Sequence, residues 1–134
     1  MRLNYDCVRD TLLLLEDKLS VSCEGGLTFD LVYLDDFTEL LDGYSAEDVY
    51  YAVFNLKQAG FISCFPCDAP EYVIDGIEYI TFAGHEFLEG IRDAGKWKTI
   101  NSILAKAKTF SLSAISAAAE GVTSALICKH TSGN

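Results

Sequence analysis

The chain has 134 residues and a net charge of −10, and half of its residues are hydrophobic. This composition can bury a core and excludes a disordered acidic segment. The start of the chain lacks the apolar run of a secretory signal, and no stretch reaches the ~18 apolar residues that span a bilayer. Five cysteines without disulfide-framework spacing fit a reducing compartment. We therefore expect a cytoplasmic protein with no membrane partner.

The negative charge is concentrated in the front two-thirds of the chain. Residues 1–90 carry 18 acidic and 4 basic residues, whereas residues 91–134 carry 2 acidic and 6 basic ones. Between Lys18 and Arg92 the only basic residue is Lys57. The field of such a surface repels nucleic acid.

The first predicted element is an amphipathic helix over about residues 4–18, with Asn4 as its N-cap. Its apolar side chains recur at spacings of three and four, which places them on one face. They are Tyr5, Val8, Leu12, Leu15 and Leu19. A loop over residues 22–26 follows the helix, and then a short strand over residues 27–29.

Two short helices joined by a tight turn come next, which is typical of a helix-turn-helix. Asp35 or Asp36 caps the first of them, which runs to Leu41. Ser45 caps the second, which runs to Ala59.

β-Structure follows the third helix. Residues 61–65 and 71–80 are predicted strands joined by a turn over residues 66–70. Asp75-Gly76, inside the second strand region, signals a hairpin or a bulge. A hairpin directly after the third helix is the wing of a winged helix.

Three further helices are predicted, one capped by Thr81, one marked by Trp97 and one capped by Ser111. The predicted fold is therefore mainly α with a small β-hairpin, in the α+β class. It consists of a winged helix-turn-helix domain over residues 1–93 and a C-terminal helical extension over residues 94–134. The extension is either part of the same compact unit or a dimerisation element.

Several motifs resemble a known family. They include Leu3 to Asp10, Gln58 to Ile62 and, most specifically, the GHEFLEGIRD run from Gly84 to Asp93, followed by Trp97. From residue 3 to about residue 126 the chain resembles a bacterial and prophage family of unknown function that is similar to winged-helix proteins. The resemblance implies a winged-helix fold and a phage or mobile-element context in a bacterial cell, and it implies no activity.

Three patterns resemble chemical sites, and each is incomplete. Cys64 and Cys67 form a single CxxC motif. The neighbouring carboxylates disfavour the low thiol pKa that a redox site needs. The motif also supplies two of the four ligands of a zinc site. Small apolar cysteines in a wing are the simpler interpretation, and metal binding is the alternative. After His85, Glu89 stands where a zinc protease helix needs a second histidine. The carboxylates lack EF-hand spacing. We expect no enzyme, no cofactor, and no catalytic or metal-binding residue.

DNA binding through the third helix and the wing is also disfavoured. Duplex binding depends on Lys and Arg that neutralise phosphates. The third helix offers Lys57 against Glu47 and Asp48, and residues 58–91 hold six acidic residues and no basic one.

Two surfaces remain as candidates for protein interaction. The third helix has more aromatic residues than its inner face needs, and acidic residues follow in the wing. One interpretation is that this surface binds a partner. The other is that the first helix or the tail covers its aromatic side chains. Its residues are Glu47, Tyr50, Tyr51, Phe54, Asn55, Asp68, Glu71 and Asp75. The last helix has a two-heptad apolar seam that serves either homodimerisation or packing within the chain. The seam residues are Leu112, Ile115, Ala119, Val122 and Leu126.

The leading hypothesis is a non-enzymatic, phage-encoded, acidic winged-helix protein-interaction module that binds a host or phage protein. In a sharper version of it, the carboxylates imitate nucleic acid and the protein inhibits a host protein. The alternative is a transcriptional regulator that binds DNA as a dimer through a basic stripe. That stripe would be built from Arg2, Arg9, Lys57, Arg92, Lys96 and Lys98.

Overall fold

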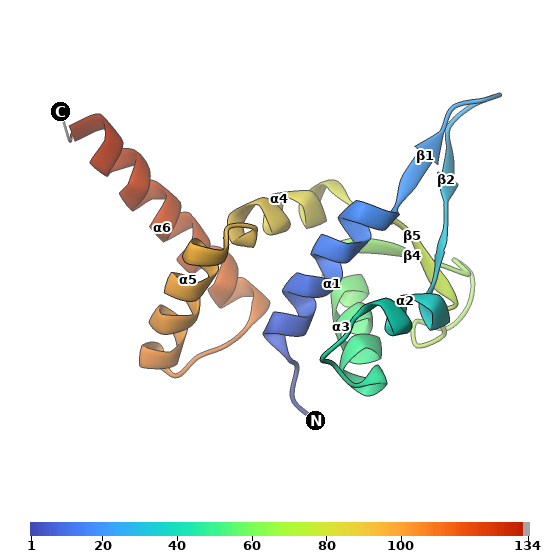
Figure 1. Cartoon of the computed structure of the whole chain (residues 1–134), viewed down its shortest axis with the longest axis horizontal. Helices are drawn as coiled ribbons and strands as arrows, with labels where there is room; N and C mark the ends of the chain where they lie inside the picture. Colours follow the sequence, from blue (N-terminus) through green and yellow to red (C-terminus); the bar gives the residue numbers. More distant parts are fainter. Residues whose placement is uncertain (133–134) are drawn as a thin grey trace. The chain divides into compact units, whose positions relative to one another are not determined.

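The computed structural model describes residues 1–132 and divides the chain into two compact units, Met1–His85 and Glu86–Asn134. Unit 1 contains α1 to α3 and all five strands, and unit 2 contains α5 and α6 (Figure 1). The division falls inside α4, earlier in the chain than the predicted boundary between residues 93 and 94. The predicted class, mainly α with small antiparallel sheets, is confirmed.

Helix α1 (Tyr5–Lys18) begins where the sequence predicts. The Asn4 side chain accepts a hydrogen bond from the Cys7 amide at 3.1 Å, which satisfies a free amide of the first turn. Val8, Leu12 and Leu15 of the predicted stripe are buried. Leu19 lies just after the last helical residue, as the C-cap.

Helices α2 (Leu34–Leu40) and α3 (Ala46–Gln58) follow. The Ser45 cap of α3 is confirmed, since its hydroxyl accepts a hydrogen bond from the Asp48 amide at 3.1 Å. The predicted caps of α2 are wrong. Asp35 and Asp36 lie in the first turn of the helix, after an N-cap at Tyr33 that makes no side-chain bond. At that place a carboxylate still interacts favourably with the helix dipole.

The main sheet has the order β3 (Val32–Tyr33), β5 (Gly76–Ile80), β4 (Ile62–Phe65), and all its pairs are antiparallel. The predicted second strand was too long, because residues 71–75 form a loop. The register shifts between Ser63 and Cys64, so the irregularity lies there and not at Asp75-Gly76.

A second hairpin, β1 (Ser20–Ser22) with β2 (Thr28–Asp30), extends away from the rest of unit 1 (Figure 1). Its turn includes Gly25 and Gly26, both at positive φ. The sequence predicted one short strand at residues 27–29. It did not predict β1, which pairs with β2, or β3, which pairs with β5.

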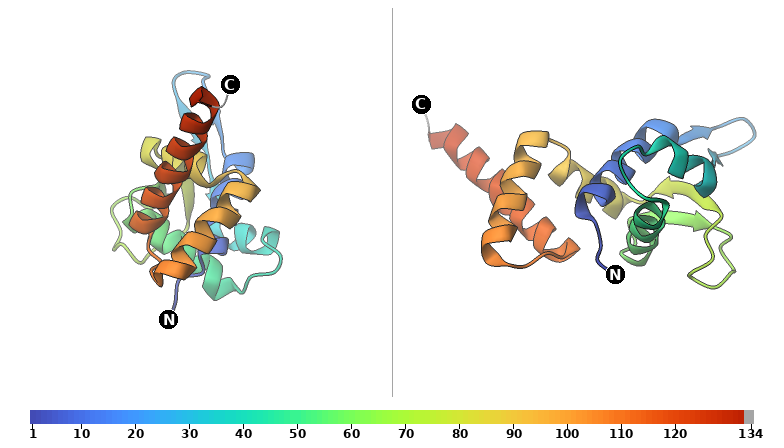
Figure 2. Two further views of the ribbon diagram at one scale, coloured as in Figure 1. Left: turned by 90° about the vertical axis from the view of Figure 1, so that its left-hand side faces the viewer. Right: turned by 60° about the horizontal axis from the view of Figure 1, so that its bottom comes forward.

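The core of unit 1 is formed by side chains from α1, α2, α3 and β5. The largest fully buried ones are Val8, Leu12, Leu15, Phe37, Val49, Val53, Leu56 and Ile77. In unit 2, α5 (Ala94–Ala107) and α6 (Leu112–Ser132) lie side by side in the views of Figure 2. Ile100 of α5 and Ile115 of α6 are buried there.

The three predicted C-terminal helices are present. Thr81 caps α4 (Phe82–Ile91) by accepting a hydrogen bond from the Gly84 amide at 3.1 Å. Ser111 caps α6 in the same way through the Ala114 amide at 3.0 Å. Over the residues that the structure describes, no helix is long and apolar enough to cross a membrane.

Helices α1, α2 and α3 and the β4–β5 hairpin follow in the predicted order, and the β1–β2 hairpin and strand β3 stand between α1 and α2. Whether unit 1 is a winged helix in the strict sense stays a prediction.

Candidate functional site

Helix α3 has two unlike faces. Val49, Ala52, Val53 and Leu56 are fully buried in the core of unit 1. Tyr50 is 39% exposed on the other side. Tyr51 and Phe54 are half-buried, and their rings lie nearly parallel with centroids 6.4 Å apart. The aromatic side of α3 is therefore only partly covered within its own unit.

An open groove runs between this side of α3 and the loop that joins β4 to β5, and we call it the α3–loop groove. Its volume is about 480 Å³, within the range of about 300–1,000 Å³ typical of ligand sites. The lining is mainly apolar and aromatic, with one carboxylate. It consists of Met1, Leu34, Glu47, Tyr50, Tyr51, Phe54, Tyr72 and Ile74.

The loop is held against α3 at several points. The Lys57 ammonium donates to the backbone carbonyl of Glu71 at 3.0 Å, and the Gln58 amide donates to the Glu71 carboxylate at 2.7 Å. Nearer β5, the Asp75 amide donates to the Phe65 carbonyl at 2.9 Å. These contacts bring Tyr72 beside the aromatic residues of α3.

Four of the eight residues predicted for the interaction surface line this groove, and four do not. The Asn55 side chain donates to the Tyr51 carbonyl at 2.8 Å, so it is used within α3. Glu71 and Asp75 hold the loop, and Asp68 is exposed outside the lining. Sequence reasoning missed Tyr72 and Ile74, because it assigned both to a strand.

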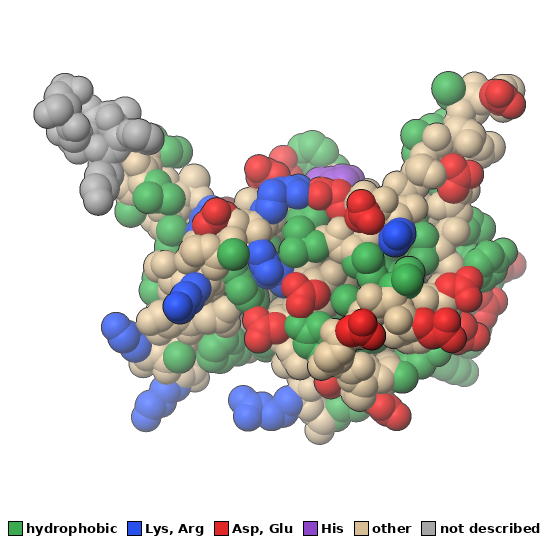
Figure 3. Space-filling model, viewed as in Figure 1, with side chains coloured by type: hydrophobic (Ala, Val, Ile, Leu, Met, Phe, Trp, Pro, Cys, Tyr) green, Lys and Arg blue, Asp and Glu red, His purple; other side chains and the backbone are tan. Residues whose placement is uncertain are grey.

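Carboxylates lie in the groove, at Glu47, and beside it, at Asp35. The Tyr50 hydroxyl donates to the Asp35 carboxylate at 2.8 Å, and this hydrogen bond raises the pKa of Tyr50. Residues 34–75 contain nine acidic residues and one basic residue, Lys57, which contacts Glu71. On the face seen in Figure 3, acidic side chains gather over the α2 side of unit 1, and basic ones over α5 of unit 2.

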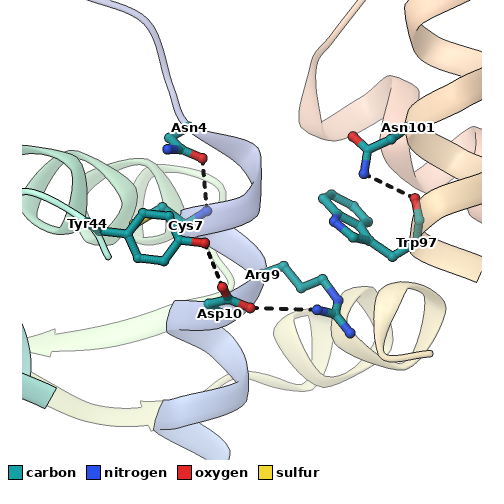
Figure 4. A network of polar contacts seen from close by, with 7 residues as sticks. All are labelled: Asn4, Cys7, Arg9, Asp10, Tyr44, Trp97 and Asn101. Carbon is teal, nitrogen blue, oxygen red and sulfur yellow. Dashed lines mark hydrogen bonds and ion pairs between the residues drawn. The ribbon is translucent and has the colours of Figure 1, made fainter. Parts of the chain in front are cut away.

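The segment before α3 is tied to α1 (Figure 4). The Tyr44 hydroxyl donates to the Asp10 carboxylate at 2.6 Å, and Arg9 lies 3.6 Å from the other oxygen of that carboxylate. Burial, followed by the bond to Asp10, raises the pKa of Tyr44 well above its usual value. This contact ties the residue before the Ser45 cap of α3 to α1.

The thiol pKa values of Cys64 in β4 and of Cys67 in the following turn are raised, whereas a redox or metal-binding CxxC needs a lowered thiol pKa. Burial raises the pKa of Cys64 to about 11. The Cys67 thiol donates to the Glu78 carboxylate at 3.3 Å, and this hydrogen bond raises its pKa as well. Both thiols therefore stay protonated at neutral pH. Among the side chains that the structure describes, which end at residue 128, no group of three or more His, Cys, Asp or Glu is placed to hold a metal.

A smaller hollow of about 250 Å³ lies between the end of α1, the β1–β2 hairpin and β5. Phe29 and Tyr79 form part of its wall, with ring centroids 4.7 Å apart, and Glu16, Glu78 and His85 also line it. Sequence reasoning missed this hollow because it depends on the β1–β2 hairpin.

The apolar seam of α6 is divided in the structure. Ile115 and Ala119 are buried within the fold, Leu112 and Val122 are half-buried, and Leu126 is 55% exposed. The first half of the seam therefore packs within the chain. Self-association through the second half stays a prediction.

The family model described as hypothetical protein DUF2513 matches residues 2–111, which include all of unit 1 and of the groove lining except Met1. The chain belongs to this family. The predicted resemblance to a family of unknown function is thereby confirmed. Searches of curated proteins and of solved structures found no match.

Proposed function

We propose that this member of the family is a non-enzymatic protein-interaction module, with a winged-helix unit 1 that binds a partner protein in the α3–loop groove. The single observation that supports this function is the lining of the groove, in which Tyr50, Tyr51, Phe54 and Tyr72 meet. Partly exposed aromatic side chains around an apolar floor are typical of the centre of a protein interface.

Helix α3 and the β4–β5 loop are the elements that a DNA-binding winged helix would use. Here they carry Lys57 and several carboxylates, and the Lys57 ammonium already contacts the Glu71 carbonyl. Duplex binding needs cations that neutralise the phosphates and release counterions. On these elements the phosphates would instead be repelled by carboxylates. A protein partner is therefore favoured over duplex DNA.

A finer version of the proposal is that the carboxylates imitate the phosphates of nucleic acid. Unit 1 would then occupy the nucleic-acid site of a host protein and inhibit it. The charge of residues 1–90, with 18 acidic against 4 basic residues, supports this version, because opposite charge accelerates association with a basic surface.

The test places a photo-crosslinking phenylalanine analogue at Tyr50 of the full chain, expressed in a bacterial host. The control carries it at Phe82, which is 80% exposed and outside the groove. We expect a partner crosslinked from position 50 and not from position 82, and the purified partner should bind the purified chain. Equal crosslinking from both positions would contradict the proposal.

A gel-shift at low salt tests the alternative, a regulator that binds DNA. We expect no duplex complex at micromolar protein. A sub-micromolar complex that is lost in Lys57→Gln would establish DNA binding through α3 and overturn the proposal.

A further inference from the structure

We infer that the partner segment bound in the α3–loop groove is basic and places an arginine side chain against the tyrosine rings. This inference rests on the proposed function and adds the chemistry of the partner. It follows from three properties of the groove: its charge, its aromatic faces and its size.

The charge of the groove favours a cation. Glu47 lies in the lining, and Asp35 accepts the hydrogen bond of the Tyr50 hydroxyl beside it. Within the described part of the chain, no Lys or Arg side chain lines the groove. The Lys57 ammonium donates to the Glu71 carbonyl, and Lys57 is not among the residues that line the groove.

The aromatic faces favour arginine over lysine. A guanidinium is planar and weakly hydrated, so it stacks on tyrosine while its N–H groups pair with carboxylates. Tyr72 is 77% exposed, and Tyr50 is 39% exposed with an acceptor carboxylate at its hydroxyl. A lysine ammonium would gain the charge interaction with less stacking.

The size of the groove favours a short segment. Its volume of about 480 Å³ has room for a few side chains, and its floor contains the apolar Leu34 and Ile74. In a segment that alternates cationic and aliphatic side chains, the cations can contact Glu47 and the tyrosine rings while the aliphatic side chains pack on Leu34 and Ile74.

The experiment measures fluorescence anisotropy of three labelled peptides of equal length, in which leucine alternates with arginine, lysine or glutamate. We expect the full chain to bind the arginine peptide more tightly than the lysine peptide, by up to about two- to fivefold, the factor from one exposed cation–π contact, of which lysine keeps a part. The glutamate peptide should not bind. Equal affinity for the arginine and lysine peptides would overturn the inference.

Two variants assign the binding to the groove. Tyr72→Leu keeps apolar area but removes the most exposed aromatic face, so it should reduce the preference for arginine. Its matched control, Phe82→Leu, changes an aromatic residue outside the groove and should retain the preference. Glu47→Gln should weaken binding of both cationic peptides about two- to fivefold. Glu24→Gln, in the β1–β2 turn, should not.

The outcomes separate this inference from the proposed function. If no peptide binds while the crosslink from position 50 persists with a purified partner, the groove is a protein site for a segment of different chemistry, and the inference fails alone. If peptide binding is unchanged in both Tyr72→Leu and Glu47→Gln, the cations bind elsewhere on the acidic surface, and the inference also fails. If no peptide binds and the crosslink from position 50 is also absent, the proposed function fails with it.

Discussion

Gly84 in α4 is a position where one added methyl group should be costly. The amide of Thr81 donates to the Phe61 carbonyl at 3.0 Å, and the Thr81 hydroxyl donates to the Gly60 carbonyl at 2.6 Å. These bonds hold the first turn of α4 against the residue before β4. A Cβ on Gly84 would overlap the Phe61 carbonyl oxygen and lie 2.7 Å from Cγ2 of Ile80.

The size of the effect follows from two opposing terms. Alanine is the better helix former by about 1 kcal/mol. Overpacking costs about 1–3 kcal/mol or more, and the upper end applies because a backbone carbonyl cannot rotate aside as a side chain can. We therefore expect Gly84→Ala to lower the free energy of unfolding by about 2 kcal/mol. For a unit of this size, that loss lowers Tm by about 8–16 °C.

The assay is thermal unfolding followed by circular dichroism, with Gly121→Ala as the matched control. Gly121 is a glycine inside a helix whose added Cβ would meet nothing within 4 Å. The control should therefore gain about 0.4–1 kcal/mol of stability. A Tm for Gly84→Ala equal to or above that of the unsubstituted chain would refute the close approach of α4 to residue 61.

Three further predictions concern stability. Ser45→Ala removes the cap of α3 and should cost about 1 kcal/mol in urea unfolding, whereas Ser45→Asp should restore most of it. Burial raises the pKa of Cys7 and Cys64 from 9.0 to about 11. The unfolded chain therefore loses these protons first, and the free energy of unfolding should be fully retained below pH 9 and fall between pH 9 and pH 11. An equal fall in the double alanine variant would refute that assignment. Ile115→Ala should cost about 2–4 kcal/mol because Ile115 is buried. Leu126→Ser should change stability by less than about 0.5 kcal/mol, and a larger loss that grows with protein concentration would show self-association of α6.

The elements that sequence reasoning predicted well are those with a local cause. Ser45, Thr81 and Ser111 each cap a helix through a hydroxyl and an amide three residues later. Such a bond forms within one turn, so the short pattern of residues contains the information. The buried stripes of α1 and α3 follow from helical spacing for the same reason.

The elements that it missed depend on distant partners. Strand β1 is three residues long, its Val21 is 59% exposed, and it shows no alternation of buried and exposed side chains. It exists because it pairs with β2, where Ser20 donates a 2.7 Å hydrogen bond to Asp30. Single short strands carry little periodic signal, so their pairing could not be predicted.

The candidate site divides in the same way. The aromatic excess of α3 is a local feature, and it predicted Tyr50, Tyr51 and Phe54. Tyr72 reaches them because the β4–β5 loop contacts α3, where Lys57 donates to the carbonyl of Glu71, fourteen positions later in the chain. No local sequence pattern specifies a contact over that separation. Four of the eight lining residues were therefore predictable from sequence. The two loop residues, Tyr72 and Ile74, were not, and neither were Met1 and Leu34.

The structure also changes how the acidic residues must be tested. Glu47 lines the groove, so under the proposed function its charge would act directly on a ligand, whereas Glu71 accepts from Gln58 and positions the loop that carries Tyr72. Glu71→Ala removes charge and acceptor together, so lost binding would not show a direct contact. Glu71→Gln keeps a side-chain carbonyl that the Gln58 amide can still donate to. If Glu71→Gln binds the arginine peptide normally and Glu71→Ala does not, Glu71 acts by holding the loop. If both lose binding equally, its charge acts on the ligand as that of Glu47 does.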